Sequence, residues 1–76
     1  MIYPIDDVDA AELKARFQFH RPKKDQLPKH ARLHEHAYLL AGHIMRGCPP
    51  SYERDAALLH IEQALFWADC SINRRE

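Results

Sequence analysis

The sequence is poor in glycine and has no excess charge of either sign. Only two glycines occur in 76 residues, and they form no glycine-rich phosphate loop, which excludes one common class of nucleotide-binding enzyme. Lysine plus arginine and aspartate plus glutamate number 11 each, so the formal net charge is zero. Proteins that bind duplex nucleic acid usually carry a clear basic excess. The composition therefore argues against duplex binding, whereas a small anionic ligand needs only a few well-placed cations.

Long apolar runs and paired cysteines are also missing. No stretch approaches the length of a transmembrane helix, and residues 1–7 lack the basic and apolar regions of a signal peptide. Cys48 and Cys70 form no metal-type pair, and antiparallel helices would hold them too far apart for a disulfide. We expect both to be buried as small hydrophobic residues in a reducing compartment. These absences predict a soluble, cytoplasmic protein with no membrane partner.

Proline and helix-capping residues divide the chain into helical segments of one domain, residues 1–76. Asp9 begins a capping-box-like sequence that predicts a short helix over about residues 10–17. Pro22 disfavours helix in the next segment, and Pro28 suits the first turn of a second helix over about residues 28–46. An irregular segment should therefore separate a short helix from a long one.

A glycine and two prolines mark the end of the second helix. Gly47 is expected to close that helix in the left-handed conformation, and Pro49 and Pro50 prevent its continuation. Ser51 then supplies the N-cap of a third helix, with acidic residues in the first turn where the helix dipole favours them. Two long helices joined by a tight turn predict an antiparallel hairpin.

Each long helix carries a continuous apolar seam. The seam residues are Leu33, Ala37, Leu40 and Ile44 in the second helix, and Leu58, Ile61, Leu65, Ala68 and Ile72 in the third. This spacing is typical of helices that pack along one another. Because no strand-like alternation occurs, the predicted fold class is all-α, with a short N-terminal helix plus a long antiparallel two-helix hairpin.

A second apolar stripe remains on the third helix after the seam is assigned. Leu59 and Phe66 lie one heptad apart and off the seam, as does Trp67. The short first helix offers little more than Leu13 and Phe17 to cover them. Since a hairpin of this size buries too little surface alone, we expect the chain to assemble as a homo-oligomer.

Six histidines raise the question of a metal site. His30 and His34 share one helix face, as zinc ligands often do, but His36 follows too closely for an H-E-x-x-H motif and no fourth ligand has a defined place. We expect a solvated or hydrogen-bonded histidine face, with no metal and no other cofactor.

Glu62 and Asp69, one heptad apart on the third helix, are interpreted as a solvated or interfacial stripe. No cysteine lies beside a base at a helix start, and the chain is too small to form a deep cleft, so we expect no enzymatic activity.

The segment after the first helix combines groups that suit a nucleotide. Phe19, His20 and Arg21 are followed by Lys23 and Lys24, so an aromatic ring that can stack on a base lies near cations that can bind phosphate. The alternative is an ordinary solvated loop whose aromatic residues pack under the hairpin. Composition alone favours this alternative slightly.

The order of motifs over residues 17–74 bears on that choice. The chain reads Phe-x-Phe-His-x-Pro, then a glutamine and a helix, and then Cys-Pro-Pro-Ser-x-Glu-Arg-x-x-Ala-Leu-x-x-Ile-Glu-x-Ala-x-x-Trp-Ala-x-x-x-Ile. This pattern resembles a phage helical-hairpin family that includes the anti-CBASS sponge and, as a related domain, the Thoeris anti-defence sponge. The resemblance covers about three quarters of the chain.

The resemblance implies a non-catalytic homo-oligomer, typically a homohexamer, in the cytoplasm of an infected bacterium. Such sponges bind cyclic dinucleotides such as cyclic GMP-AMP, and some bind cyclic trinucleotides, in pockets between protomers. Holding the second messenger keeps the downstream immune effector silent. The apolar surplus and the lack of a catalytic constellation agree with this implication.

The same resemblance assigns ligand-binding roles to particular residues. It implies that Phe19 stacks on a base with His20 beside it, that His34 and the neighbouring Arg32 contact phosphate, and that Arg74 contributes at a protomer junction. Matching apolar residues, Trp67 among them, are interpreted as structural.

Several positions depart from the family pattern, and other functions stay open. Phe19 stands where the family often has tyrosine, Leu59-His60 stands where Thr-Lys is expected, and Tyr52 stands where Arg is expected. The ligand can therefore differ from that of other members. A helical protein–protein adaptor or inhibitor without a nucleotide ligand explains the apolar surplus equally well. Single-stranded nucleic-acid binding is disfavoured by the charge balance.

Overall fold

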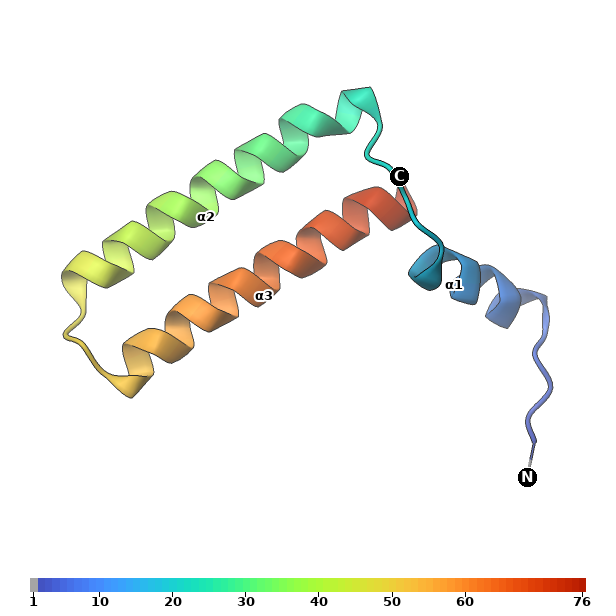
Figure 1. Cartoon of the computed structure of the whole chain (residues 1–76), viewed down its shortest axis with the longest axis horizontal. Helices are drawn as coiled ribbons and strands as arrows, with labels where there is room; N and C mark the ends of the chain where they lie inside the picture. Colours follow the sequence, from blue (N-terminus) through green and yellow to red (C-terminus); the bar gives the residue numbers. More distant parts are fainter. Residues whose placement is uncertain (1) are drawn as a thin grey trace.

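A computed structural model describes residues 2–76 and contains helices and turns over this range. The elements are α1 (Asp7–Phe17), the short 3-10 helix η1 (Lys24–Gln26), α2 (Leu27–Gly47) and α3 (Tyr52–Arg75). Helices α2 and α3 run antiparallel as a long hairpin, and α1 lies beyond the open end of that hairpin (Figure 1). The predicted all-α fold, with a short N-terminal helix and a long two-helix hairpin, is confirmed.

Helix α1 begins three residues earlier than the sequence pattern predicts. Asp6 is the N-cap, and its Oδ1 accepts a hydrogen bond of 2.8 Å from the amide of Asp9. Asp9 Oδ2 accepts in return from the amide of Asp6 at 3.4 Å, which completes a capping box. The prediction that Asp9 is itself the cap is therefore wrong, because two aspartates spaced by three satisfy each other's amides. Glu12 is thereby left out of the cap and can pair elsewhere.

The prolines, rather than the glycine, determine the backbone conformation of the junction between α2 and α3. Gly47 is the last helical residue, and within residues 2–76 no residue has a positive φ, so the expected left-handed Gly47 is wrong. Cys48, with φ −118° and ψ 139°, leaves the helix in extended conformation instead, as the residue before a proline must. Ser51 caps α3 as predicted, since its Oγ accepts from the Arg54 amide at 3.1 Å.

The hairpin seam matches the prediction except at one position. Residues that face the partner helix are half-buried: Leu33, Ala37, Ala41 and Ile44 on α2, and Leu58, Ile61, Leu65, Ala68 and Ile72 on α3. Leu40, predicted to belong to the seam, is 52% exposed. The seam steps by four, four and three along α2, so the half-buried Ala41 takes that place.

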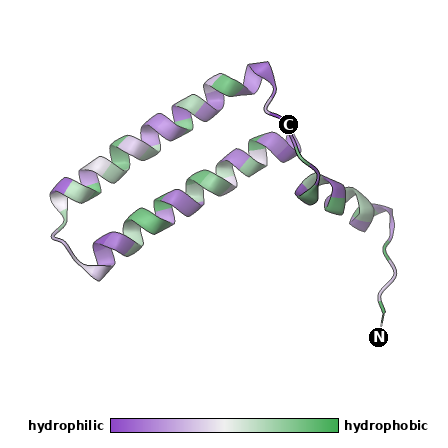
Figure 2. Ribbon diagram, in the orientation of Figure 1, coloured by the Kyte–Doolittle hydropathy of each residue, from purple (hydrophilic) through white to green (hydrophobic). Residues whose placement is uncertain are grey.

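The protein is one helix thick, and no apolar side chain is buried among the described residues. Its extents are 51 × 39 × 14 Å, and its radius of gyration is 17.1 Å. A compact chain of this length would have a radius of about 11 Å. Apolar residues are distributed along both long helices and α1 (Figure 2). Phe66 and Leu59 are 55% and 51% exposed, so the predicted second stripe is present and uncovered in the single chain.

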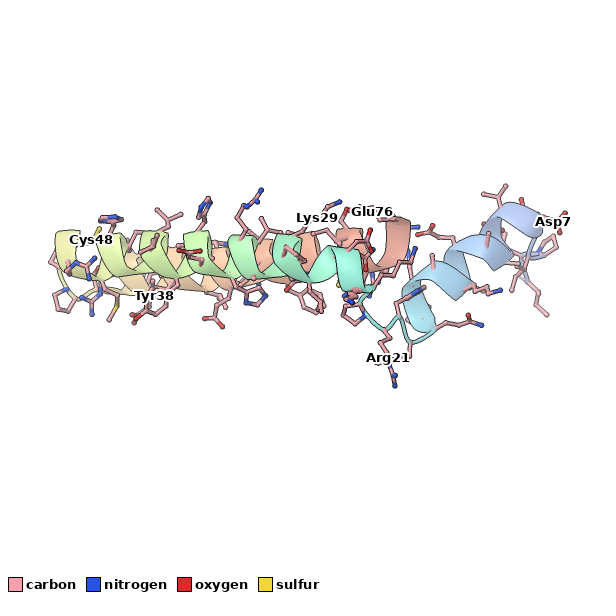
Figure 3. The ribbon with its side chains drawn as sticks, turned by 90° about the horizontal axis from the view of Figure 1, so that it is seen from above. Asp7, Arg21, Lys29, Tyr38, Cys48 and Glu76 are labelled. Carbon is pink, nitrogen blue, oxygen red and sulfur yellow. The ribbon has the colours of Figure 1, made fainter. Side chains whose placement is uncertain are left out.

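Polar side chains, rather than apolar ones, fix the open end of the hairpin. Gln26, 2% exposed, is the one buried residue in the described range. Its Oε1 accepts from the Lys23 amide at 2.9 Å, and its Nε2 donates to the Ile72 carbonyl at 3.1 Å. Lys29 forms an ion pair with Glu76, and Figure 3 shows these two labelled residues side by side at this end. The segment before α2 is thus joined to the end of α3.

The two cysteines are free, as expected, but their surroundings differ. Cys70 is half-buried on α3, whereas Cys48 is exposed, so its predicted burial is wrong. Cys48 lies at the hairpin tip, labelled in Figure 3, where no other described element covers it. Over residues 2–76, neither long helix carries an apolar stretch sufficient to cross a bilayer.

Candidate anion-binding site

A recess of about 500 Å³ lies where α1 meets the C-terminal turns of α3. Its lining residues are Arg16, Phe17, Trp67, Cys70, Ser71, Arg74 and Arg75. Successive turns of α3 place position 67 near positions 70, 71 and 74, which lie three, four and seven residues further along. Arg16 and Phe17, in the last turn of α1, line the other side of the recess. The recess therefore combines guanidinium groups with exposed aromatic rings.

One carboxylate neutralises part of this positive charge. Glu12 accepts two hydrogen bonds from Arg75, at 2.9 Å from Nη1 and 2.8 Å from Nη2, and a further one from Arg16. The hydrogen bonds from Arg75 and then from Arg16 lower the pKa of Glu12 to about 2, so its carboxylate stays ionised at neutral pH. Arg74 makes no ion pair with any residue of the described chain. It is thus the recess arginine that has no carboxylate partner in the described chain.

The aromatic rings of the recess are open to solvent. Phe17 is 79% exposed and Trp67 is 61% exposed. The Trp67 and Phe66 rings form a T-shaped pair, with centroids 5.0 Å apart and planes at 78°, a favourable arrangement that helps to orient the indole. Exposed rings beside guanidinium groups form the combination that binds a base together with its phosphate. Trp67, interpreted from sequence as structural, therefore lies at the recess in the single chain.

The five residues predicted from the sequence do not meet at one point within the chain. Arg74 lines the recess. Phe19, 86% exposed, follows α1, and His20 Nε2 donates to the Ala15 carbonyl at 2.8 Å. Arg32 and His34 lie exposed on α2. Their roles as ligand contacts remain predictions.

His34 belongs to a different arrangement, in which two histidines share one aspartate across the hairpin. His34 Nε2 donates to Asp69 Oδ2 at 2.8 Å, and His30 Nδ1 donates to Asp69 Oδ1 at 2.6 Å. His30 Nε2 lies 2.9 Å from Asn73 Oδ1. Both ring nitrogens of His30 thus face oxygen atoms, an arrangement that favours the protonated imidazolium. The expectation of a hydrogen-bonded histidine face is confirmed for these two residues.

The positive charge on His30 and the negative charge on Asp69 stabilise each other. The hydrogen bond to Asp69 raises the pKa of His30, although burial opposes the rise. Burial raises the pKa of Asp69, but the hydrogen bonds from His30 and His34 outweigh it and leave that pKa below its usual value. Within residues 2–76, no group of three or more His, Cys, Asp or Glu side chains is arranged to hold a metal ion. The arrangement therefore joins α2 to α3 by charge-assisted hydrogen bonds.

A second recess of about 700 Å³ lies along the hairpin and is mostly apolar. It is lined by His34, Glu35, Ala37, Tyr38, Ala41, Met45, Leu58, Ile61, Glu62 and Leu65. Tyr38, labelled in Figure 3, projects from one face of the hairpin and is 79% exposed. This groove exposes the side of the seam that the partner helix does not cover.

Sequence reasoning missed the contributions of Glu12, Arg16 and Arg75 to the first recess. Glu12 and Arg16 are four residues apart on a helix, a spacing that signals an ion pair. No local signal links Glu12 to Arg75, because 63 residues separate them in the chain. Only the position of α1 against α3 brings the two together.

Comparison with known proteins identifies the hairpin. The family model of the Acb2/Tad1 hairpin domain matches residues 9–72, which span most of α1, the linker, α2 and nearly all of α3. No curated protein and no solved structure shows significant similarity to the chain. The family consists of ligand-binding sponges rather than catalysts. The match covers far more than half of the sequence, so the chain belongs to the Acb2/Tad1 hairpin family and has the sponge-type anti-defence role that this membership implies.

Proposed function

We propose that the protein binds and sequesters cyclic oligonucleotide second messengers without altering them. The ligands are cyclic dinucleotides, with cyclic GMP-AMP as an example, or cyclic trinucleotides. Sequestration would block CBASS-type immune signalling in the bacterial cytoplasm during phage infection. The observation that carries this proposal is the family match over residues 9–72. The recess with exposed Trp67 beside Arg74 supports it, because stacking and phosphate contacts are what a cyclic nucleotide needs.

Assembly is the second part of the proposal, and we expect a homohexamer. A layer 14 Å thick with no buried apolar side chain in its described part cannot form a core from its own residues. The exposed stripe of Leu59 and Phe66, and the apolar groove along the hairpin, supply surface for neighbouring copies. Static light scattering measures the mass directly. A stable monomer at the concentrations used for binding would contradict the assembly.

Titration calorimetry with a panel of cyclic di- and trinucleotides tests the ligand. We expect at least one member of the panel to bind, with the ligand recovered unchanged afterwards by mass spectrometry. No binding across the panel would refute the proposal. Recovery of a cleaved ligand would instead indicate an enzyme.

The substitution Phe19→Ala tests the aromatic contact. Phe19 is 86% exposed, so its loss should weaken nucleotide binding while the oligomer mass stays the same. The expected loss is on the order of tenfold, since stacking on one aromatic side chain contributes about 1–3 kcal/mol. Tyr52→Ala is a matched control, because Tyr52 is an 83% exposed aromatic residue at the opposite end of the hairpin. Dissociation of the Phe19 variant into monomers would make Phe19 a packing residue.

The apolar groove gives specific support to a second function, that of a protein–protein adaptor or inhibitor. A partner helix could lie along the groove bordered by Met45 and Leu65. A monomer that binds no member of the nucleotide panel would favour this function over the sponge.

A further inference from the structure

The Glu12 carboxylate occupies one of the positions on Arg75 that suit an anionic ligand. Arginine presents a planar fork that fits carboxylate and phosphate groups equally well, through two parallel hydrogen bonds. In this protein both hydrogen bonds of that fork go to Glu12, at 2.9 and 2.8 Å. Arg16 Nε donates to Oε2 of the same carboxylate, the oxygen that also accepts from Arg75 Nη2. Two of the three arginines that line the recess are therefore already paired with a group of this chain.

The paired groups are accessible to solvent. The side chains of Glu12 and Arg75 are 38% and 48% exposed in their ion pair, and that of Arg16 is 59% exposed. Exposed ion pairs exchange partners at little cost, because water and dissolved ions screen them. A phosphate held first by the unpaired Arg74 would lie in the same recess as the Arg75 fork. It could then replace the carboxylate without rearranging the hairpin.

The same ion pair provides the polar connection between α1 and α3. Among the described residues, the hydrogen bonds from Arg75 to Glu12 are the ones that join these two helices. No apolar side chain of α1 is buried, so little else holds α1 in place. Displacing Glu12 from Arg75 should therefore free α1 from the hairpin.

We propose that Glu12 is a specificity-determining residue that competes with the ligand's phosphate for Arg75, and that α1 is released from α3 when the phosphate takes its place. Ligands that offer two phosphate groups, one for Arg74 and one for the Arg75 fork, would overcome this competition better than ligands that offer one. The inference rests on the proposed capture of phosphate-bearing ligands.

Inorganic pyrophosphate is the probe for the test, because it carries two phosphate groups and no base. Calorimetry would compare the unaltered protein with Glu12→Gln, which keeps the side chain's shape and removes its charge. We expect Glu12→Gln to bind pyrophosphate more tightly by roughly two- to fivefold, the range that the loss of an exposed competing ion pair implies. Glu53→Gln removes the same charge at the far end of α3 and should leave the affinity unchanged. Arg75→Gln should weaken binding whether or not Glu12 is also replaced.

Hydrogen exchange of the α1 amides gives a second readout, one that a merely structural Glu12 would not produce. In the unaltered protein, pyrophosphate should speed exchange over residues 7–17. In Glu12→Gln, exchange should be fast without pyrophosphate and insensitive to it. Far-UV circular dichroism establishes that α2 and α3 remain folded in each variant.

Three results would overturn the inference. They are equal or weaker pyrophosphate binding by Glu12→Gln, slower α1 exchange on pyrophosphate binding, and no pyrophosphate binding by either protein. The cyclic nucleotide panel separates this inference from the proposed function. A protein that shows the predicted competition with pyrophosphate but binds no cyclic nucleotide would refute the sponge proposal alone.

Discussion

Replacing His30 by alanine removes the centre of the hydrogen-bonded group that joins α2 to α3. The imidazole donates to Asp69 at 2.6 Å and faces Asn73 Oδ1 at 2.9 Å. Its side chain is 14% exposed, whereas that of Asp69 is 25% exposed, so water screens these bonds only in part. After the substitution Asp69 keeps its hydrogen bond from His34, and Asn73 loses its partner.

The expected loss of stability follows from these two hydrogen bonds. A hydrogen bond to a charged group contributes about 1.5–3 kcal/mol and a neutral one about 1 kcal/mol. Because His34 still pairs with Asp69, the lower end of this range applies, and we expect His30→Ala to lower the free energy of unfolding by about 2 kcal/mol. For a chain of this size, that loss corresponds to a fall of roughly 8–16 °C in Tm.

The loss of unfolding free energy caused by His30→Ala should depend on pH in a defined direction. The pKa of His30 is raised above its ordinary 6.5, so its charged contribution is complete below about pH 6.5 and is lost as the pH rises through the folded-state pKa. The pKa of Asp69 is lowered from 3.8, so its contribution is present above that value and is lost as the pH falls through the folded-state pKa. Glu76 adds further negative charge near His30. His30 and Asp69 should therefore stabilise the hairpin most at about pH 4–6.5.

Urea unfolding followed by circular dichroism measures this difference. Protein concentration must be constant, because assembly shifts the apparent stability. We expect a gap of about 2 kcal/mol between the unaltered protein and His30→Ala near pH 5.5, and a smaller gap near pH 9, because the charged contribution of His30 is lost as the pH rises. His36→Ala is the control, because His36 is exposed on α2 and no hydrogen bond of its imidazole is found in the described chain. An equal gap at both pH values, or a loss no larger than that of His36→Ala, would refute the reasoning.

Two further substitutions test the capping and junction hydrogen bonds. Gln26→Ala removes the buried amide that bridges the Lys23 amide and the Ile72 carbonyl, and should lower the free energy of unfolding by about 1–3 kcal/mol in urea titrations. An effect as small as that of Gln63→Ala, on exposed surface of α3, would contradict it. Ser51→Ala removes the α3 N-cap and should cost about 1 kcal/mol in thermal melts, whereas an unchanged Tm would show that the cap is dispensable.

Local sequence signals predicted the helices well because their causes are local. Ser51 caps α3 through an amide three residues away, and Pro28 lies in the first turn of α2, as expected. The errors also have local causes. Asp6 competes successfully with Asp9 for the cap of α1, and the proline after Cys48 imposes an extended exit that makes a left-handed Gly47 unnecessary.

The candidate site was only partly predictable from sequence. Arg74 was expected to bind ligand and lies in the recess, but the sequence did not connect it with Phe17 or Trp67. Resemblance to the family pointed to residues whose predicted roles involve contacts between protomers. A single sequence holds no signal for which surfaces of neighbouring copies meet, so Arg32 and His34 remain predictions about the assembly.

The second apolar stripe of α3 shows most clearly which features the sequence determines and which depend on the tertiary structure. The sequence by itself determined that the chain is helical, that two seams form a hairpin, and that Leu59 and Phe66 are left over, because helical periodicity fixes which residues share a face. It also carried the motifs that identify the family. Tertiary structure alone decided that α1 lies beyond the hairpin instead of covering that stripe, and that Glu12 meets Arg75. These outcomes depend on contacts between residues far apart in the chain, which no local spacing encodes.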